Sequence, residues 1–266
     1  MGLFFNFDKP GPGVDKDAPK KKGIFLYFEL FFRKFWLLLK ANMLYFIVSL
    51  PVMALYNFIL INALGTFMSE VGGEAVWHLS VVLTAFFAIY WGTGPVTGGY
   101  VYLLRNFARE EHVFLASDFF EKSKETFKIG LITLIADLII MILGINAISV
   151  YHAMIVQGVT IAKYALVAMF VMFILYTFMH YYIYEFSVTF ENSVRETFKN
   201  SFVTAAATFP ANLLLTVFGI VVSVYAFSYI TSFAVIILMF LMWISFMRFP
   251  VDFYAARMIK RRFIDK

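Results

Sequence analysis

Long apolar stretches alternate with short polar segments along the chain. Six of them approach or exceed the roughly 20 mainly apolar residues that a helix needs to cross about 30 Å of hydrocarbon. They cover residues 36–62, 76–104, 129–151, 162–186, 211–228 and 231–247. One span with a re-entrant segment is the alternative for residues 211–247, because only a few residues around Tyr229 separate the last two stretches. The pattern predicts an all-α polytopic membrane helix bundle with six transmembrane helices.

The composition places lipid around the outer faces of these helices. The 266 residues are 62% hydrophobic and 15% charged, whereas soluble domains are about 45–50% apolar and about 25% charged. A chain of this length cannot bury such an excess in one core, so we expect the lipid bilayer to be its solvent. Residues 23–266 are interpreted as a single membrane domain. Residues 1–22 are polar and contain three prolines among glycines and lysines, which is typical of a flexible cytoplasmic arm.

The distribution of positive charge predicts the orientation. Of the 22 Lys and Arg residues, 21 lie in the N-terminal segment up to Lys40, in the second and fourth loops, or after the last span. The exception is Lys163, at the outer end of the fourth span. Cytoplasmic loops of membrane proteins carry an excess of Lys and Arg. Because one missing span would invert every later loop, this asymmetry predicts six spans with both ends in the cytoplasm. The first 30 residues lack the uninterrupted apolar core of a signal peptide, so we expect the first span to act as its own insertion signal.

Catalytic and metal-binding signatures are missing from the sequence. The chain has no cysteine, which excludes disulfides and thiolate metal sites. It has no phosphate-binding loop, no serine elbow and no histidine pair at metal-ligand spacing. The four histidines are scattered over four segments: His78, His112, His152 and His180. We therefore expect no enzyme activity, no cofactor, no metal and no nucleic-acid partner.

Residues 23–40 are rich in Phe and Leu but include charged positions, which favours a helix in the cytoplasmic interface of the bilayer. Glu29 and Arg33 are four positions apart and can pair on one face of that helix. A docking helix for a neighbouring subunit is the alternative, with Phe31 and Trp36 as candidate contacts.

The second and fourth loops share a further pattern. Asp118 with Glu121, and Ser193 with Glu196, resemble capping boxes at helix starts. The same four residues, Glu-Thr-Phe-Lys, occur at 125–128 and 196–199 and lead from each loop helix toward the next span. The repeated residues predict three tandem helical hairpins, each with an amphipathic helix on the inner face.

Ionisable residues within the spans are few, and burying a charge in lipid costs at least about 2.5–3.5 kcal/mol on insertion scales. Asp137 lies in the middle of the third span, and His180 and Glu185 lie in the inner half of the fourth. A packed structural carboxyl group is the preferred interpretation of Asp137, and a proton-coupling site is the alternative. Four asparagines within the spans can form inter-helix hydrogen bonds: Asn42, Asn57, Asn146 and Asn212.

The second span contains an unusual cluster of glycine, proline and threonine. Its residues are Gly92, Gly94, Pro95, Thr97, Gly98 and Gly99. A break of this kind is tolerated in a membrane only where protein or a water-filled cavity satisfies the freed backbone groups. A tight, kinked packing surface is the preferred interpretation. A substrate-lining broken helix, as in transporters, and a surface for docking a partner are the alternatives.

Several segments together resemble the YesL-like family of bacterial membrane proteins, whose function is formally unknown. The resemblance covers roughly the first half of the chain by motif, in Gly11-Pro12-Gly13-Val14, Phe31-Phe32-Arg33-Lys34-Phe35-Trp36, Gly94-Pro95-Val96-Thr97-Gly98-Gly99, Leu104-Arg105-Asn106-Phe107-Ala108-Arg109-Glu110 and Ser117-Asp118-Phe119-Phe120. It implies a location in the bacterial cytoplasmic membrane. It also implies a link with carbohydrate uptake, because genes of this family typically lie beside those of sugar ABC importers.

The leading hypothesis is a non-catalytic accessory subunit that stabilises or positions the permease subunits of a carbohydrate ABC importer. The glycine-proline segment and residues 23–40 are the expected docking surfaces, and Arg105 and Arg109 are further candidates. An independent small transporter or channel is the alternative, with Asp137, His180 and the broken second span lining its path. A membrane-embedded enzyme is disfavoured because no acid, base or metal set is clustered.

Overall fold

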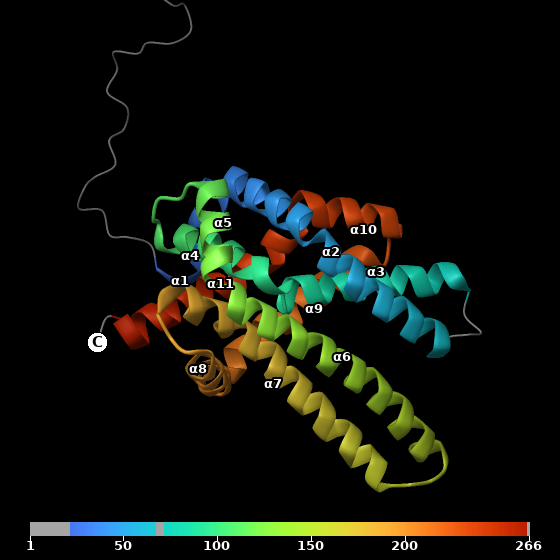
Figure 1. Cartoon of the computed structure of the whole chain (residues 1–266). Helices are drawn as coiled ribbons and strands as arrows, with labels where there is room; N and C mark the ends of the chain where they lie inside the picture. Colours follow the sequence, from blue (N-terminus) through green and yellow to red (C-terminus); the bar gives the residue numbers. More distant parts are fainter. Residues whose placement is uncertain (1–21, 68–71, 265–266) are drawn as a thin grey trace, which may run out of the picture.

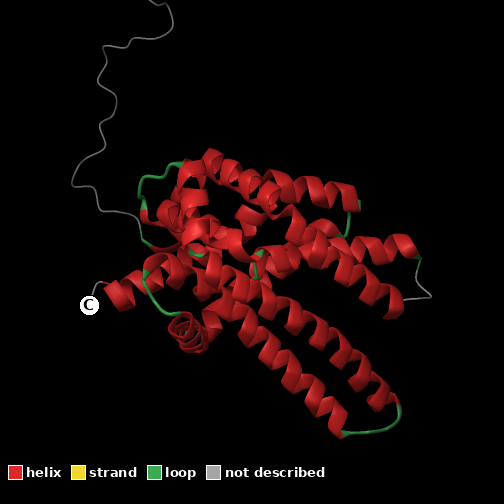
Figure 2. Cartoon of the chain, viewed as in Figure 1, coloured by secondary structure: helices red, strands yellow, loops and turns green. Residues whose placement is uncertain are grey.

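The computed structural model describes residues 22–67 and 72–264, and within these ranges every regular element is a helix (Figure 2). The predicted arm at residues 1–22 lies almost entirely outside the described residues. The elements, in chain order, are α1 (Gly23–Arg33), α2 (Phe35–Phe67), α3 (Gly73–Tyr90), η1 (Gly94–Val96), α4 (Thr97–Arg109), α5 (Leu115–Glu125), α6 (Phe127–Val156), α7 (Ile161–Thr189), α8 (Val194–Ala207), α9 (Phe209–Phe227), α10 (Ser232–Leu238), η2 (Met239–Trp243), α11 (Ile244–Ile259) and η3 (Lys260–Ile264).

Six helices of the described chain are long and apolar enough to cross a membrane, as predicted. They are Phe35–Thr66, Gly73–Tyr90, Phe127–Val156, Ile161–Thr189, Phe209–Phe227 and Ser232–Ile264. The predicted second span, residues 76–104, was too long. It ends at Tyr90, because the glycine-proline segment interrupts the helix before α4 begins. The last pair consists of two separate span-length helices, so the re-entrant alternative is not what the structure shows.

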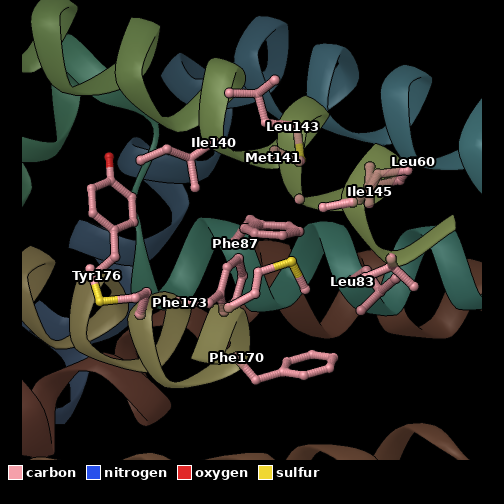
Figure 3. Close-up of a pocket in the computed structure, with 15 residues that line it drawn as sticks. Leu60, Leu83, Phe87, Ile140, Met141, Leu143, Ile145, Phe170, Phe173 and Tyr176 are labelled. Atoms are coloured by element: carbon pink, nitrogen blue, oxygen red, sulfur yellow. The ribbon is translucent and has the colours of Figure 1, made fainter. Parts of the chain in front are cut away.

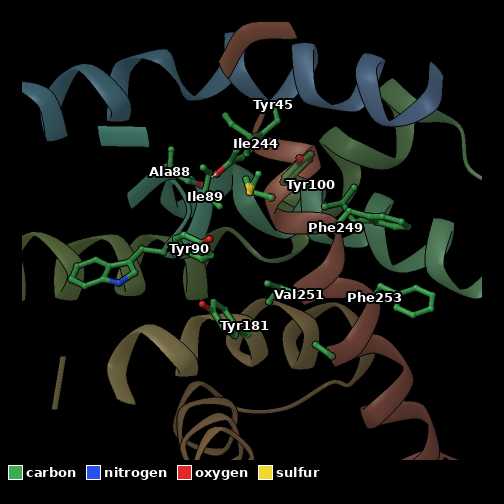
Figure 4. Close-up of a cluster of buried hydrophobic side chains, with 14 of the residues drawn as sticks. Tyr45, Ala88, Ile89, Tyr90, Tyr100, Tyr181, Ile244, Phe249, Val251 and Phe253 are labelled. Carbon is green, nitrogen blue, oxygen red and sulfur yellow. Dashed lines mark hydrogen bonds between the residues drawn. The ribbon is translucent and has the colours of Figure 1, made fainter. Parts of the chain in front are cut away.

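The helices form a bundle in which one hairpin diverges from the rest. Figure 1 shows α6 and α7 as a long antiparallel pair that extends away from α2 and α3 toward the α6–α7 turn. The short helices α1, α5 and α8 gather with α4 and the end of α11 at the opposite end of the molecule. Helix α11 runs through the middle, where it contacts α2, α3, α4 and α7. Figure 4 shows aromatic side chains from these helices, including Tyr45, Tyr100 and Tyr181, packed around it.

Two of the predicted helix starts need correction. The helix of residues 23–40 is two helices, because α1 ends at Arg33 and α2 begins at Phe35 after the turn at Lys34. Asp118 lies inside the first turn of α5 and not at its start. Its carboxylate accepts a hydrogen bond from the Phe114 backbone N–H at 2.9 Å, so it still satisfies one of the free donors at the helix end.

Other local predictions are confirmed. Arg33 pairs with Glu29 at 3.4 Å and also with Glu110, which ties α1 to the end of α4. Ser193 and Glu196 form a reciprocal capping box at the start of α8. The repeated Glu-Thr-Phe-Lys segments, however, occupy different places. Residues 125–128 join α5 to α6, whereas residues 196–199 lie within α8, so this sequence match does not mark equivalent positions of a structural repeat.

Candidate functional site: a buried polar network at the helix break

The break between α3 and α4 depends on two glycines with left-handed backbone conformations. Gly92 has a φ of +87° and Gly94 a φ of +72°, values that residues with a side chain rarely adopt. They lead into the single turn η1, from which α4 starts in a new direction. Trp91, at the break, is completely buried.

Backbone N–H and C=O groups around the break, which have no partner within a helix, form hydrogen bonds with side chains of the same chain. The Ile89 carbonyl accepts a hydrogen bond from Arg248 Nη1 at 2.8 Å, and the Gly92 carbonyl accepts one from the Tyr56 hydroxyl at 3.2 Å. The Thr93 N–H donates to Thr97 Oγ1 at 2.7 Å. Arg248 thus places a positive charge at the C-terminal end of α3, where the helix dipole favours one. These hydrogen bonds show that protein groups, and not a water-filled cavity, satisfy these backbone groups, as the interpretation as a packing surface requires.

Close packing accounts for the remaining glycines of the cluster. A Cβ at Gly98 would overlap the Thr126 side chain, and one at Gly99 would overlap the Phe119 carbonyl. A Cβ at Gly94 would press on Leu134, so α6 also passes directly over η1. Gly92, Gly94, Gly98 and Gly99 all face other parts of the same chain in this structure, and none of them forms an external surface. Their geometry agrees with the preferred interpretation of the sequence, a tight and kinked packing surface.

Asp137 and His180 form a fully buried pair beside the break. His180 Nε2 lies 2.8 Å from Asp137 Oδ1, which also accepts a hydrogen bond from the Tyr176 hydroxyl at 2.7 Å. His180 Nδ1 lies 3.0 Å from the Tyr176 carbonyl. A carbonyl only accepts, so Nδ1 carries a proton. The Nε2–Oδ1 contact therefore joins either a neutral histidine to a protonated carboxyl group or an imidazolium to a carboxylate.

The side chain of Trp91, at the helix break, covers one face of the His180 ring. The Trp91 ring stacks on the His180 ring with centroids 5.4 Å apart and planes 10° apart. Trp91 Nε1 donates to Thr177 Oγ1 at 2.9 Å, which fixes the indole against α7. The structure thus brings together three elements that the transporter hypothesis had placed along one path: α6, α7 and the broken span.

Glu185 belongs to a second buried cluster, where the C-terminal end of α7 packs against α4. It is fully buried, and its carboxylate lies 3.5 Å from Arg109 Nη2. Arg105 lies on the same helix as Arg109 and donates from Nη1 to Thr189 Oγ1 at 3.1 Å. Burial lowers the pKa of Arg105, and the negative charge of Glu185 opposes this effect. The two arginines, predicted as docking candidates, hold α4 against the end of α7.

Sequence reasoning missed the pair formed by Arg248 and Asp252. Arg248 was counted with the basic tail, but the last span continues as a helix past it, and both side chains are buried. Arg248 Nε donates to Asp252 Oδ2 at 3.2 Å. The signal was present in the sequence, because an Arg and an Asp four positions apart at the end of an apolar stretch can pair on one helix face.

A cavity of about 470 Å³ lies beside the network, between the hairpin of α6 and α7 and the helices α2 and α3 (Figure 3). Its lining is almost entirely apolar and includes Leu60, Leu83, Phe87, Gly144 and Phe173. Tyr176 lines one end, so the phenol that binds Asp137 also borders the cavity. Within the described residues, no three His, Cys, Asp or Glu side chains are grouped as metal ligands.

Phe31 and Trp36 occupy opposite environments. Phe31 is buried against the last span, with its ring 5.7 Å from that of Phe246. Trp36, at the start of α2, is 71% exposed, and several apolar side chains of α1 are exposed as well. No family model, curated protein or solved structure matches this chain. The function of the chain is therefore inferred from its membrane architecture and from the contacts and exposure of its side chains.

Proposed function

We propose that this chain is a non-catalytic accessory subunit that binds the permease subunits of a carbohydrate ABC importer in the bacterial cytoplasmic membrane. One observation carries the proposal: α1 and the start of α2, packed on the bundle by their other side, display exposed aromatic side chains. Phe25, Phe28 and Phe32 of α1 and Trp36 of α2, here called the aromatic face, are between 49% and 73% exposed. Interfaces between proteins are enriched in such aromatic residues.

The aromatic face is preorganised for binding. The other side of α1 buries Leu26, Leu30 and Phe31 against the bundle, and Arg33 pairs with Glu110. A helix fixed in this way loses little conformational entropy when a partner binds. The glycine-proline segment, by contrast, is used within the chain, so the docking surface is assigned to the aromatic face alone.

The proposed orientation has both termini in the cytoplasm. It is supported by the charge asymmetry of the loops together with the grouping of α1, α5 and α8 at one end of the bundle (Figure 1). The identity of the partner rests on the resemblance to the YesL-like family. The apolar lining of the cavity supports a role other than sugar passage, because a sugar path requires polar groups along it.

Site-specific photo-crosslinking tests this assignment. A benzophenone amino acid placed at Phe28 or Phe32 should crosslink to a permease subunit in native membranes. The matched control is Phe218 on α9, whose side chain is 59% exposed. Crosslinks only to lipid from positions 28 and 32, or equal protein crosslinks from position 218, would remove the aromatic face as a docking surface.

The second candidate function is an independent proton-coupled transporter, favoured by the buried Asp137–His180 pair. Buried ionisable pairs beside a broken helix mark proton and substrate pathways in transporters. Reconstituted protein should then move a sugar or ion alone, and Asp137→Asn should remove the pH dependence of that flux. Vesicles that show no flux across a broad sugar and ion panel would exclude this function for those solutes.

A further inference from the structure

We infer that the apolar cavity is a binding site for one acyl chain of a membrane phospholipid. The cavity lies wholly among residues of the membrane-spanning helices α2, α3, α6 and α7. Residues of its rim face outward as well, since Leu143 and Met172 are both 63% exposed. In a membrane, this rim contacts the hydrocarbon chains of the bilayer, and they are the ligand present at its mouth.

The size of the cavity favours a hydrocarbon chain as its ligand over a helix of a partner protein. A partner's membrane-spanning helix, about 10 Å wide and about 30 Å long, fills roughly 2,400 Å³. The cavity of about 470 Å³ is far smaller than such a helix. A flexible hydrocarbon chain has the narrow section and the apolar surface that this space requires.

Gly144 gives the cavity its depth. It lies in the middle of α6 and lines the cavity, and a Cβ built on it meets no atom within 4 Å. The glycine clusters at the helix break pack directly against neighbouring helices, whereas the space over Gly144 is open. Apolar walls that face open space lose dispersion contacts, and an inserted acyl chain restores them.

The position of the site gives the bound chain a structural role. The chain would lie between the α6–α7 hairpin and the helices α2 and α3, which diverge at this level (Figure 1). Its inner end would reach Tyr176, whose hydroxyl holds Asp137. Figure 3 shows Tyr176 at one end of the space and Leu60 and Leu83 at the other. The lipid chain thereby fills the gap between the two helix pairs and supports the wall that carries the buried Asp137–His180 pair.

Trp91 provides a reporter for occupancy. Its ring packs on two cavity-lining residues, with centroids 4.7 Å from Phe87 and 5.1 Å from Phe173, and it is itself completely buried. The other three tryptophans are replaced by Phe (Trp36→Phe, Trp77→Phe, Trp243→Phe), and the protein is reconstituted in phosphatidylcholine with dibrominated chains. Bromine quenches indole fluorescence at short range, so a chain in the cavity should quench Trp91 relative to unbrominated vesicles.

The variant Gly144→Leu closes the space and should largely abolish this quenching. Gly65→Leu is the matched control, because Gly65 also lies on a span with open space at its Cβ but does not line the cavity. It should leave the quenching unchanged. If Gly144→Leu fails to fold, Ala147→Phe fills the same cavity from the next turn.

Native mass spectrometry supplies an independent readout. The protein released from mild detergent should retain a phospholipid, and Gly144→Leu should lose it while Gly65→Leu keeps it. Equal quenching in Gly144→Leu and the parent protein would overturn the inference, as would a parent protein that carries no phospholipid. Neither result depends on a permease partner, so this test and the crosslinking test fail independently.

Discussion

Glycines at the break between α3 and α4 act in two physically different ways. Gly92 and Gly94 are needed for their positive φ angles as well as for the lack of space for a Cβ, whereas Gly98 and Gly99 are needed only because neighbouring backbone or side chains occupy the space of a Cβ. Sequence analysis could identify the cluster and predict a break, because glycine and proline interrupt helices. It could not distinguish the two roles, which depend on where α5 and α6 pack.

Gly99→Ala should destabilise the protein by about 1–3 kcal/mol, as overpacking of a well-packed interior does. The new methyl group would overlap the Phe119 carbonyl of α5, which is backbone and cannot rotate away. Gly65→Ala is the control, because its Cβ would enter open space. Thermal unfolding in detergent should show a lower Tm for Gly99→Ala and an unchanged or higher Tm for Gly65→Ala. Equal Tm values would contradict the packing role.

Asp137 and His180 should be energetically coupled. Asp137→Ala leaves buried polar groups of His180 and Tyr176 without a partner, which costs about 1–3 kcal/mol. The double variant Asp137→Ala/His180→Ala should be less destabilised than the sum of the two single variants, because each change removes the same contact. A double-mutant cycle by denaturant unfolding measures this, and strict additivity would argue against the direct pair.

At the scale of elements, local signals predicted helix starts where the cap is a property of a few adjacent residues. Ser193 with Glu196 is such a case, and the capping box is present. Asp118 was predicted at the start of its helix but lies in the first turn. The two positions are hard to tell apart in sequence, because a carboxylate in the first turn can bind the same free backbone donors as a cap. The π-helical segment η2 could not be predicted. Its Met239 and Phe240 carbonyls accept hydrogen bonds from Asn42 on α2, which is far away in the sequence.

The capping box of α8 should respond to pH in a defined direction. Hydrogen bonds to Glu196 from the Ser193 side chain and then from the Ser193 backbone N–H lower the pKa of this carboxyl group. The stabilisation is therefore fully present above the unfolded-state pKa and is lost as pH falls through the lowered pKa. Ser193→Ala should raise the pKa of Glu196 toward its ordinary value, as measured by carbon NMR with Glu196→Gln for assignment. An unchanged pKa would contradict the box.

At the scale of the whole molecule, hydropathy and loop charge predicted the number of spans correctly. They could do so because the need for about 20 apolar residues per crossing is independent of how the helices pack. Which helices touch was not predictable. The pairing of Asp137 with His180, and of Arg109 with Glu185, joins residues 43 and 76 positions apart, and helical periodicity carries no information on such neighbours.

The proposed orientation can be tested cleanly because the chain contains no cysteine. Gln157→Cys lies at the α6–α7 turn, and Glu111→Cys lies between α4 and α5. A membrane-impermeant maleimide added to intact cells should label position 157, and it should reach position 111 only after permeabilisation. The reverse pattern would invert the proposed topology.

The central claim, that this chain is an accessory subunit of a sugar importer, is tested most directly by quantifying what it binds in native membranes. A tag placed after the C-terminus, mild detergent extraction and quantitative mass spectrometry give the stoichiometry. We predict importer permease subunits at a fixed ratio, reduced in Phe28→Ser/Phe32→Ser but not in the control Leu214→Ser/Phe218→Ser on α9, whose side chains are exposed to a similar degree. A homomer without permease subunits, or an equal loss in both variants, would contradict the account.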